Sequence, residues 1–372
     1  MSITGTVPHY VSGLDKTNGG TRTGLVSRNS IAVVLFQLGG PDSLEAVEPF
    51  LHNLFSDPDI IDFPFARLAR PLLARLVASR RARKVLEHYA RIGGKSPIRE
   101  LTELQAKALE QELRQDLDAR VFVAMRYWHP FAEEGVQAVV SRGFREVVLL
   151  PLYPQYSKTT TGSSLNEWYR KLACLQIHLH SAVVREFYDH PLYLEAVVER
   201  VNQGLARFRE PNGASDHGRP SNSQKVYLIF SAHGLPISVV EAGDPYQAQV
   251  EASVKLVMER GGWSNPHTLC YQSRVSPGRW LQPSLDSTLG RLAAEGAESI
   301  LVVPISFVSD HVETLYEIDI EAREHAVRAG IRQFELMPAL NNSPTFIRSL
   351  ASLVLREVRS RAESAASAAE TH

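Results

Sequence analysis

Residues 299–321 read SILVVPISFVSDHVETLYEIDIE, and the rest of the chain is best understood outward from this stretch. Ser299–Ile305 is a short, mostly apolar run rich in β-branched residues, which is typical of a strand buried on both faces of a parallel sheet. From Ser309 or Asp310, either of which is an expected N-cap, the pattern becomes helical. A buried strand followed by a helix predicts an open α/β sheet.

The predicted helix carries a row of acidic residues. At about 100° per residue, Asp310, Glu313, Glu317 and Glu321 fall within a stripe about 80° wide. Like charges four residues apart destabilise a helix by about 0.2–0.5 kcal/mol per pair, and the helix dipole offsets this only in the first turn. The row suits hydrated divalent cations or protons passed along it, unless it is simply a solvated acidic face. His311 favours the chemical interpretation, because ligands bind at the C-terminal ends of such strands.

Composition limits the class of protein. The 372 residues are enough for two domains, and 44% hydrophobic with 22% charged residues is usual for a globular protein. A net charge of −1 gives no overall attraction to nucleic acid, so we expect no such partner. No segment approaches the roughly 18–20 apolar residues of a membrane span. Residues 1–28 lack a signal-peptide core and are expected to be a flexible leader of a cytoplasmic protein.

The two halves of the sequence resemble each other. GFREVVLLP at 143–151 and GAESILVVP at 296–304 share a glycine eight residues before a proline, and VVLFQLGGP at 33–41 resembles YLIFSAHGLP at 227–236. Repeated βα units predict two Rossmann-like domains, each with a doubly wound parallel sheet, related by internal duplication and separated by a cleft. The expected segments are domains at 29–170 and 171–342, a polar surface loop at 210–224, a C-terminal helix at 343–361 and a flexible tail at 362–372.

The repeat also isolates His233. The first copy has Gly39-Gly40 where the second has His233-Gly234, so an imidazole is expected at a strand end facing the cleft. A structural histidine hydrogen-bonded in a turn is the alternative. The glycine pair could belong to a phosphate loop, but neither GxGxxG nor a following Lys-Ser/Thr is present, which disfavours a nucleotide site.

Residues 60–84 form a basic and strongly apolar stretch. Apolar residues between Ile60 and Val77 alternate with arginines, and no acidic residue lies between Asp62 and Glu87. Such a stretch can lie on a membrane surface or form the mouth of an apolar pocket. The alternative is a core helix whose arginines extend to solvent.

Eight short segments resemble the ferrochelatase family. The strongest are SAHGLP at 231–236 and FVSDHVETLYE at 307–317. The others are NLFSDPD at 53–59, YARIGGKSP at 89–97, MRYWHP at 125–130, YPQY at 153–156, TTGSS at 160–164 and GDPY at 243–246. They follow the family order, and the resemblance covers about 31–360.

The resemblance implies a lyase-type metal chelatase with two Rossmann-like domains around a porphyrin cleft. Such an enzyme inserts ferrous iron into protoporphyrin IX, releases two protons and gives protohaem, the last step of haem biosynthesis. No obligate protein partner is implied. By resemblance His233 and Glu313 are the central catalytic pair, supported by Asp310 and His311. The metal would meet His233, Glu313, Glu317 and Glu321.

The resemblance also implies a set of porphyrin contacts. The implied residues are Leu38, Tyr89, Ser96, Arg80, Arg81, Arg126, Tyr127, Trp280 and Phe307. Tyr89, Ser96 and the arginine pair match positions near the propionates, where guanidinium groups can bind carboxylates in a bidentate manner. Arg126 and Tyr127 would form the wall opposite Phe307 and Trp280. Residues 60–77 would be an apolar lip at the cleft mouth that touches the inner surface of the membrane.

Two departures from the family pattern bear on cofactors. Some members hold an iron–sulfur cluster through a cysteine after Gln-Tyr-Ser and others near the C-terminus. Here Lys158 follows Ser157 and no cysteine lies beyond Cys270, so we expect no cluster and no required cofactor. Gln282 also replaces a glycine that is usual before the proline at 283.

Three alternatives stay open. Coproporphyrin III has more carboxylates and should favour a more polar cleft mouth than residues 60–77 provide. A related chelatase could act on another tetrapyrrole, such as sirohydrochlorin with cobalt. A haem or porphyrin carrier would need the aromatic pocket, but not an acidic row that faces an imidazole.

Overall fold

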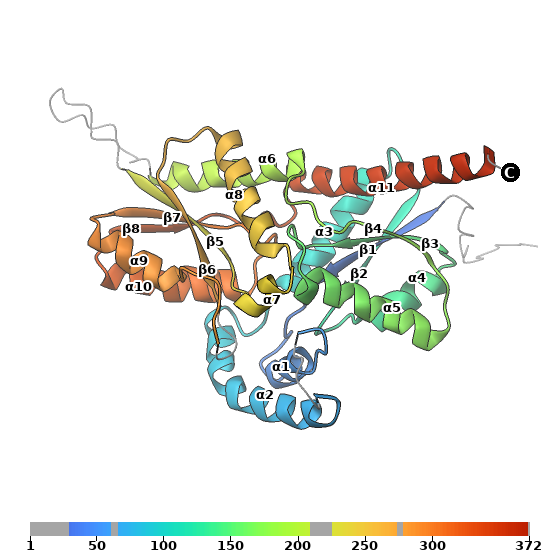
Figure 1. Cartoon of the computed structure of the whole chain (residues 1–372), viewed down its shortest axis with the longest axis horizontal. Coiled ribbons are helices and arrows are strands. Elements are labelled where there is room, and N and C mark those ends of the chain that lie inside the picture. Colours follow the sequence, from blue (N-terminus) through green and yellow to red (C-terminus); the bar gives the residue numbers. More distant parts are fainter. Residues whose placement is uncertain (1–29, 61–65, 209–224, 274–277, 371–372) are drawn as a thin grey trace, which may run out of the picture.

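The chain forms two parallel four-stranded sheets that lie beside each other, each flanked by helices (Figure 1). This computed structural model describes residues 30–60, 66–208, 225–273 and 278–370. The predicted α/β fold with two Rossmann-like domains is confirmed. The expected leader at 1–28 and the surface loop at 210–224 lie outside the described residues.

The first domain has the strand order β2-β1-β3-β4. Its elements are β1 (Ile31–Gln37), α1 (Val47–Phe55), α2 (Ala66–Arg91), α3 (Ile98–Leu113), β2 (Ala119–Met125), α4 (Ala132–Ser141), β3 (Glu146–Pro151), η1 (Lys158–Gly162), α5 (Ser163–Leu175) and β4 (His180–Val183). The central strand β1 is buried from Ala32 to Gln37, because helices cover both faces of a parallel sheet.

The second domain has the equivalent order β6-β5-β7-β8. Its elements are α6 (Pro191–Leu205), η2 (Ala206–Phe208), β5 (Val226–His233), α7 (Ile237–Glu241), α8 (Tyr246–Gly261), β6 (His267–Gln272), α9 (Leu285–Ala294), β7 (Ser299–Pro304), η3 (Glu313–Ala322), α10 (Arg323–Arg328) and β8 (Gln333–Leu336). The final helix α11 spans Pro344–Glu370. The run that opened the sequence argument is thus β7, buried at all six positions.

The sequence repeat is a structural repeat. Gly143 and Gly296 precede β3 and β7, which occupy the same place in the two sheets. Both glycines have a positive φ, 83° and 82°, which a residue without Cβ adopts at low cost at the end of a helix. After each strand, the next backbone N–H donates to the central strand, from Leu152 to Phe36 and from Ile305 to Ser231. The predicted internal duplication therefore extends to individual hydrogen bonds.

The expected domain boundary at residue 170 was wrong. β4 pairs in parallel with β3, so the first sheet continues to Val183. The short strand HSAV was missed because it has no long apolar run. The C-terminal segment also differs from the prediction, since α11 continues to Glu370 through an alanine-rich region that favours helix. This helix leaves the second domain and packs on β3 and β4 of the first.

One apolar core joins the two domains. Leu35 of β1 and Phe230 of β5 belong to the same buried cluster, together with Phe346 of α11. The cluster continues through α6, whose Val197 and Val201 are buried between the domains and α11. The walls of the interdomain cleft are therefore attached to a shared hydrophobic core.

Helices α1 and α2 form a hairpin below the two sheets (Figure 1). On α2, Ala74, Ala78 and Ala82 share one face and are buried against α1, where small side chains allow a close approach. Leu72 and Leu76 point outward, with 75% and 48% of their surfaces exposed. In a core helix these leucines would be buried, so the structure disfavours the alternative of a core helix whose arginines extend to solvent. Residues 61–65 of the predicted lip lie outside the described chain.

Candidate active site

A cavity of about 970 Å³ lies between the two sheets and the α1–α2 hairpin. The ends of β1, β3, β5 and β7 contribute Leu38, Tyr153, His233 and Phe307 to its wall. It is thus located where open α/β sheets bind ligands, outside the carboxyl ends of the strands. Its volume lies within the range of about 300–1,000 Å³ that is usual for ligand sites.

Most of the residues predicted for the site line this one cavity. They are Leu38, Arg80, Arg81, Tyr89, Ser96, His233, Trp280, Phe307, His311, Glu313, Glu317 and Glu321. They come from both domains and from α2. Three predicted residues, Asp310, Arg126 and Tyr127, are packed elsewhere and are treated separately below.

His233 and Glu313 contact each other directly in the wall of the cavity. His233 is the last residue of β5, and its Nδ1 lies 2.8 Å from Glu313 Oε2 on the first turn of η3. The imidazole keeps 30% of its side-chain surface exposed and the carboxylate 14%, so both remain partly accessible. The alternative of a structural histidine in a turn does not explain why this partly accessible pair lines the 970 Å³ cavity.

The environment makes this pair strongly polar. Burial by itself would lower the pKa of His233, but the charge of Glu313, the hydrogen bond to it and the charge of Glu317 together raise that pKa. Burial pushes the pKa of Glu313 upward, whereas His233, His311 and the Ser273 hydroxyl outweigh it and lower that pKa. The neighbouring carboxylates thus favour the charged form of the imidazole, and the imidazole in turn favours the charged form of Glu313.

Ser273 is a site residue that the sequence did not reveal. Its Oγ lies 3.1 Å from Glu313 Oε2 and also hydrogen-bonds Glu317 Oε2. Burial and the charge of Glu313 raise the pKa of Glu317 to about 8, so this second carboxyl holds a proton at neutral pH. The only available signal was the position of Ser273 directly after the strand β6. Its φ of 60°, unusual for a residue with Cβ, cannot be read from sequence.

The acidic row lies on a π-helix rather than the α-helix that the periodicity predicted. η3 covers Glu313–Ala322, and its i→i+5 hydrogen bonds give more than four residues per turn. Residues four apart therefore stay near one face, and Glu313, Glu317 and Glu321 all line the cavity. The opposite face buries Ile318 and Ala322 in the second domain. The row is a wall of the cleft, and the alternative of a purely solvated acidic face does not hold.

Asp310 does not join this row. It precedes the helix, and its carboxylate accepts hydrogen bonds from Asn341 Nδ2 at 2.9 Å and from Thr314 Oγ1 at 3.2 Å. The expected N-cap at Ser309 or Asp310 was also wrong, because helical structure begins at Val312 without a side-chain cap. Asp310 instead holds the loop that carries His311.

His311 lies in the cavity wall beneath Phe307, with ring centroids 4.7 Å apart. Its Nδ1 contacts the Ser309 carbonyl at 3.0 Å, and its Nε2 lies 3.9 Å from Glu313 Oε1. Phe307 is also perpendicular to the His233 ring at 6.4 Å. The Phe307 ring thus lies near the rings of both His233 and His311, and each of these two imidazoles has a nitrogen close to the Glu313 carboxylate.

The predicted ring contact of Arg126 and Tyr127 needs correction. Arg126 is 2.8 Å from the fully buried carboxylate of Asp57, and the Tyr127 hydroxyl donates to the same carboxylate at 2.5 Å. Ser163 Oγ donates to it as well, at 2.5 Å. Neither Arg126 nor Tyr127 lines the cavity. Their bonds to Asp57 connect the segment after α1 to the ends of β2 and η1, and so stabilise the cavity wall without contacting the cavity.

The remaining walls are aromatic and basic. Trp280 and Tyr89 are almost fully buried, with 6% and 2% of their surfaces exposed. Arg80 and Arg81 line the cavity from α2, and the Arg81 guanidinium lies 5.7 Å above the Phe55 ring. Apolar walls with a few basic groups on one side suit a flat hydrophobic ligand that bears carboxylates.

Within the described chain, no group of three or more His, Cys, Asp or Glu side chains is arranged to hold a metal ion. His233 and Glu313 point at each other, while Glu317 and Glu321 line the cavity from later positions of η3. Such an arrangement can receive a metal ion temporarily and accept protons. It is not a closed structural metal site, which needs about four ligands.

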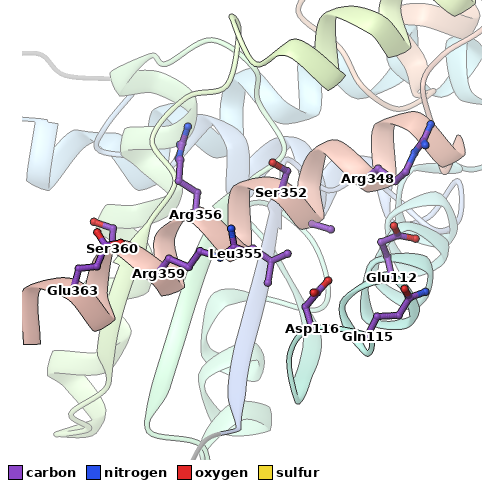
Figure 2. A pocket seen from close by; sticks show the side chains of 11 residues that line it. Glu112, Gln115, Asp116, Arg348, Ser352, Leu355, Arg356, Arg359, Ser360 and Glu363 are labelled. Atoms are coloured by element: carbon purple, nitrogen blue, oxygen red, sulfur yellow. The ribbon is translucent and has the colours of Figure 1, made fainter. Parts of the chain in front are cut away.

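A second hollow lies between α3 and α11 (Figure 2), with a volume of about 630 Å³. Its lining residues are Glu112, Gln115, Asp116, Arg348, Ala351, Ser352, Leu355, Arg356, Arg359, Ser360 and Glu363. Three arginines are balanced by three acidic residues, and this lining contains no aromatic side chain. The hollow therefore offers neither a charge preference nor a flat apolar surface.

Comparison with known sequences assigns the family. The sequence model of the ferrochelatase family matches residues 30–358. The chain belongs to the ferrochelatase family. It is 50% identical over 323 residues to a ferrochelatase of Geotalea daltonii, covering 87% of this chain and 96% of that one. It is 46% identical over 327 residues to a ferrochelatase of Aquifex aeolicus, covering 88% and 99%.

A solved structure described as SirB from Bacillus subtilis with Fe³⁺ has the same fold, with a TM-score of 0.50 at 10% identity over 88% of this chain and 95% of that one. The chain is thus an enzyme of the metal chelatase class, a lyase of porphyrin and haem biosynthesis. The cavity and the His233–Glu313 pair are the candidate active site of this ferrochelatase.

Proposed function

We propose that the enzyme inserts ferrous iron into protoporphyrin IX and releases two protons, with the ring bound in the 970 Å³ cavity. The observation that carries the proposal is the His233–Glu313 pair, 2.8 Å apart above aromatic walls. An imidazole bonded to a carboxylate can act as a base toward a pyrrole N–H or meet the arriving metal. A carrier protein would have no use for such a pair.

Proton release is the step that the acidic row serves. Each proton that the His233–Glu313 pair takes from a pyrrole N–H must be passed on before the pair can accept the next one. Ser273 bonds both Glu313 and Glu317, and Glu321 follows on the same helix face. We propose that protons leave, or hydrated iron arrives, along this row.

Two adjacent parts of the cavity wall suit the two kinds of substituent on protoporphyrin IX. Phe50, Leu51, Leu54 and Phe55 of α1 give an apolar part, which fits methyl and vinyl groups. Arg80, Arg81 and Lys84 of α2 give a basic part beside it, which fits two propionates. Coproporphyrin III would place further carboxylates against the apolar part, where burying an unpaired charge is costly.

Protoporphyrin IX is therefore expected to be the better substrate. Wild-type enzyme incubated anaerobically with ferrous iron and either protoporphyrin IX or coproporphyrin III should give a kcat/KM at least about tenfold higher for the former, since one unpaired buried carboxylate exceeds about 1.4 kcal/mol. The appearance of the metalloporphyrin absorbance measures both rates. Equal rates would refute the predicted preference, and a reversed preference would assign the enzyme to coproporphyrin. A bound-ligand spectral shift without turnover would favour the carrier.

We also propose that the α2 surface contacts the membrane at its inner face. Leu72, Leu73, Leu76 and Val77 are exposed together on one helix, and Ile60 is both exposed and part of the cavity wall. An exposed apolar patch that continues into a cavity is a suitable entrance for a substrate that partitions into lipid. Among the described residues, none of the helices combines the length and apolarity needed for a membrane crossing.

Replacing Leu72 and Leu73 by serine should weaken binding to liposomes by about tenfold or more, since each fully buried leucine contributes about 1.5–3 kcal/mol. Sedimentation with anionic vesicles measures the partition. Val327→Ser is the matched control, because Val327 is 62% exposed on α10, outside this patch. Equal partition of all three proteins would refute the membrane proposal.

We propose that the enzyme works without an iron–sulfur cluster or another resident cofactor. The whole sequence contains two cysteines, whereas such a cluster is usually held by four cysteine thiolates. Cys174 is exposed on α5 and Cys270 is buried in β6, so they do not share a site.

A further inference from the structure

The main chain of His233 is held by side chains on both of its polar groups. Its N–H donates to Ser306 Oγ at 3.0 Å, and its carbonyl accepts from the Tyr246 hydroxyl at 3.0 Å. His233 is the last residue of β5, where the strand ladder ends and the backbone would otherwise depend on the following turn. Two separate elements, the loop after β7 and the start of α8, thus fix one residue.

Ser306 and Tyr246 hold the two polar main-chain groups of one residue, the N–H and the carbonyl of His233. Tyr246 is 5% exposed, so water does not easily replace the hydrogen bond that its hydroxyl donates.

Tyr246 is connected to the first domain through Asp244. One carboxylate oxygen, Oδ1, accepts from the Tyr246 N–H at 3.0 Å. The other, Oδ2, accepts from Ser157 Oγ at 3.0 Å and from the Lys158 N–H at 2.8 Å, at the start of η1. Asp244 is 92% buried and thereby links the two domains directly beside the cavity wall.

We propose that Tyr246 and Ser306 are positioning residues that hold the His233 main chain, and thereby aim its imidazole at the substrate in the cavity. The inference rests on the proposed role of His233. Its side chain leaves from the backbone atom between the two held groups, so loss of either bond lets the imidazole tilt away from Glu313. Neither residue needs to touch the reacting atoms for this effect.

The variants Tyr246→Phe and Ser306→Ala test the proposal, since each removes one hydroxyl. We expect kcat for metal insertion to fall roughly 10- to 100-fold in each, because a displacement of about 1 Å has effects of that size. Tyr246 and Ser306 also line the cavity, but each variant removes only one hydroxyl from the wall and leaves Trp280 and Phe307 in place, so the KM for porphyrin should stay within about twofold of wild type. Ser306→Thr keeps the hydroxyl and should recover most of the activity.

The double variant distinguishes the positioning role from a general loss of stability. Because both hydroxyls hold the main chain of the same residue, Tyr246→Phe/Ser306→Ala should lose little more activity than the stronger single variant. Tyr193→Phe is the matched control. Tyr193 is 1% exposed and its hydroxyl donates to the carbonyl of Ile305, next to Ser306, but it does not line the cavity. It should lower the melting temperature comparably and leave kcat near wild type.

The outcomes separate this inference from the proposed function. If His233→Ala loses turnover while Tyr246→Phe and Ser306→Ala match Tyr193→Phe, the positioning role is wrong and the role of His233 stands. If His233→Ala keeps turnover, the proposed function of the pair fails first. Fully additive losses in the double variant, or a large rise in porphyrin KM with unchanged kcat, would also overturn the positioning role.

Discussion

His233→Ala and Glu313→Gln should each lower the rate of iron insertion by about 10²–10⁴-fold, the usual effect of losing a group that transfers protons. The pair lies 2.8 Å apart at the top of the cavity, and each partner shifts the pKa of the other. Removing either one leaves the other without its partner and the pyrrole protons without an acceptor. Porphyrin should still bind, because its walls come from Trp280, Phe307 and α1.

Turnover is measured anaerobically by metalloporphyrin absorbance, and porphyrin binding by quenching of its fluorescence. The control pair is His129→Ala and Glu134→Gln. These side chains form the same kind of contact, 2.7 Å from His129 Nδ1 to Glu134 Oε2, but they are about half exposed and lie outside the cavity. The control variants should keep wild-type turnover. Near wild-type rates for both His233→Ala and Glu313→Gln would refute the assignment.

Asp57→Asn is expected to lower the free energy of unfolding by about 3–5 kcal/mol, the usual cost of removing one partner from a buried ion pair. The Asp57 carboxylate is fully buried and is bonded by Arg126 and Tyr127 after β2 and by Ser163 at the start of α5. Asparagine cannot accept from all these donors, and it leaves the Arg126 guanidinium, 11% exposed, without its main charge partner.

Asp59→Asn is the control two residues away. Asp59 pairs with Arg170 at 2.9 Å, but the arginine side chain is 41% exposed, and exposed pairs contribute about 0–1 kcal/mol. Chemical denaturation followed by fluorescence measures both variants. A change below about 1 kcal/mol for Asp57→Asn would show that this network does not hold the wall in place.

The fold was predictable because its strands are simple in pattern. β1, β5 and β7 are continuous apolar runs, since helices cover both sheet faces, and the repeated Gly-to-Pro segments indicated the duplication. The boundary near residue 170 failed for the opposite reason. β4 is a four-residue edge strand without such a run, and only its pairing with β3 reveals it.

The site was predictable where a residue type carries the chemistry. His233 and the acidic row stood out because an imidazole and carboxylates at strand ends have few structural reasons to be there. Ser273, Tyr246 and Ser306 act through hydroxyl groups whose partners come from other segments, so no local pattern marks them. The helix type of η3 was missed as well, because acidic residues four apart fit an α-helix and a π-helix equally well.

Arg126 and Tyr127 show how a residue can be important and still be placed wrongly. Their position at the end of β2 is that of cavity residues in a parallel sheet. The buried carboxylate of Asp57 draws both side chains away from the cleft, and its partners could not be known before the chain was folded.

The most direct test is a crystal structure of the protein with protoporphyrin IX and no metal. The ring should lie in the cavity between α1 and the loop after β7, with its centre facing His233 and Glu313, its propionates toward Arg80 and Arg81, and no contact with Arg126. A ring bound elsewhere, for example in the hollow between α3 and α11, or bound with its centre turned away from His233, would contradict the account.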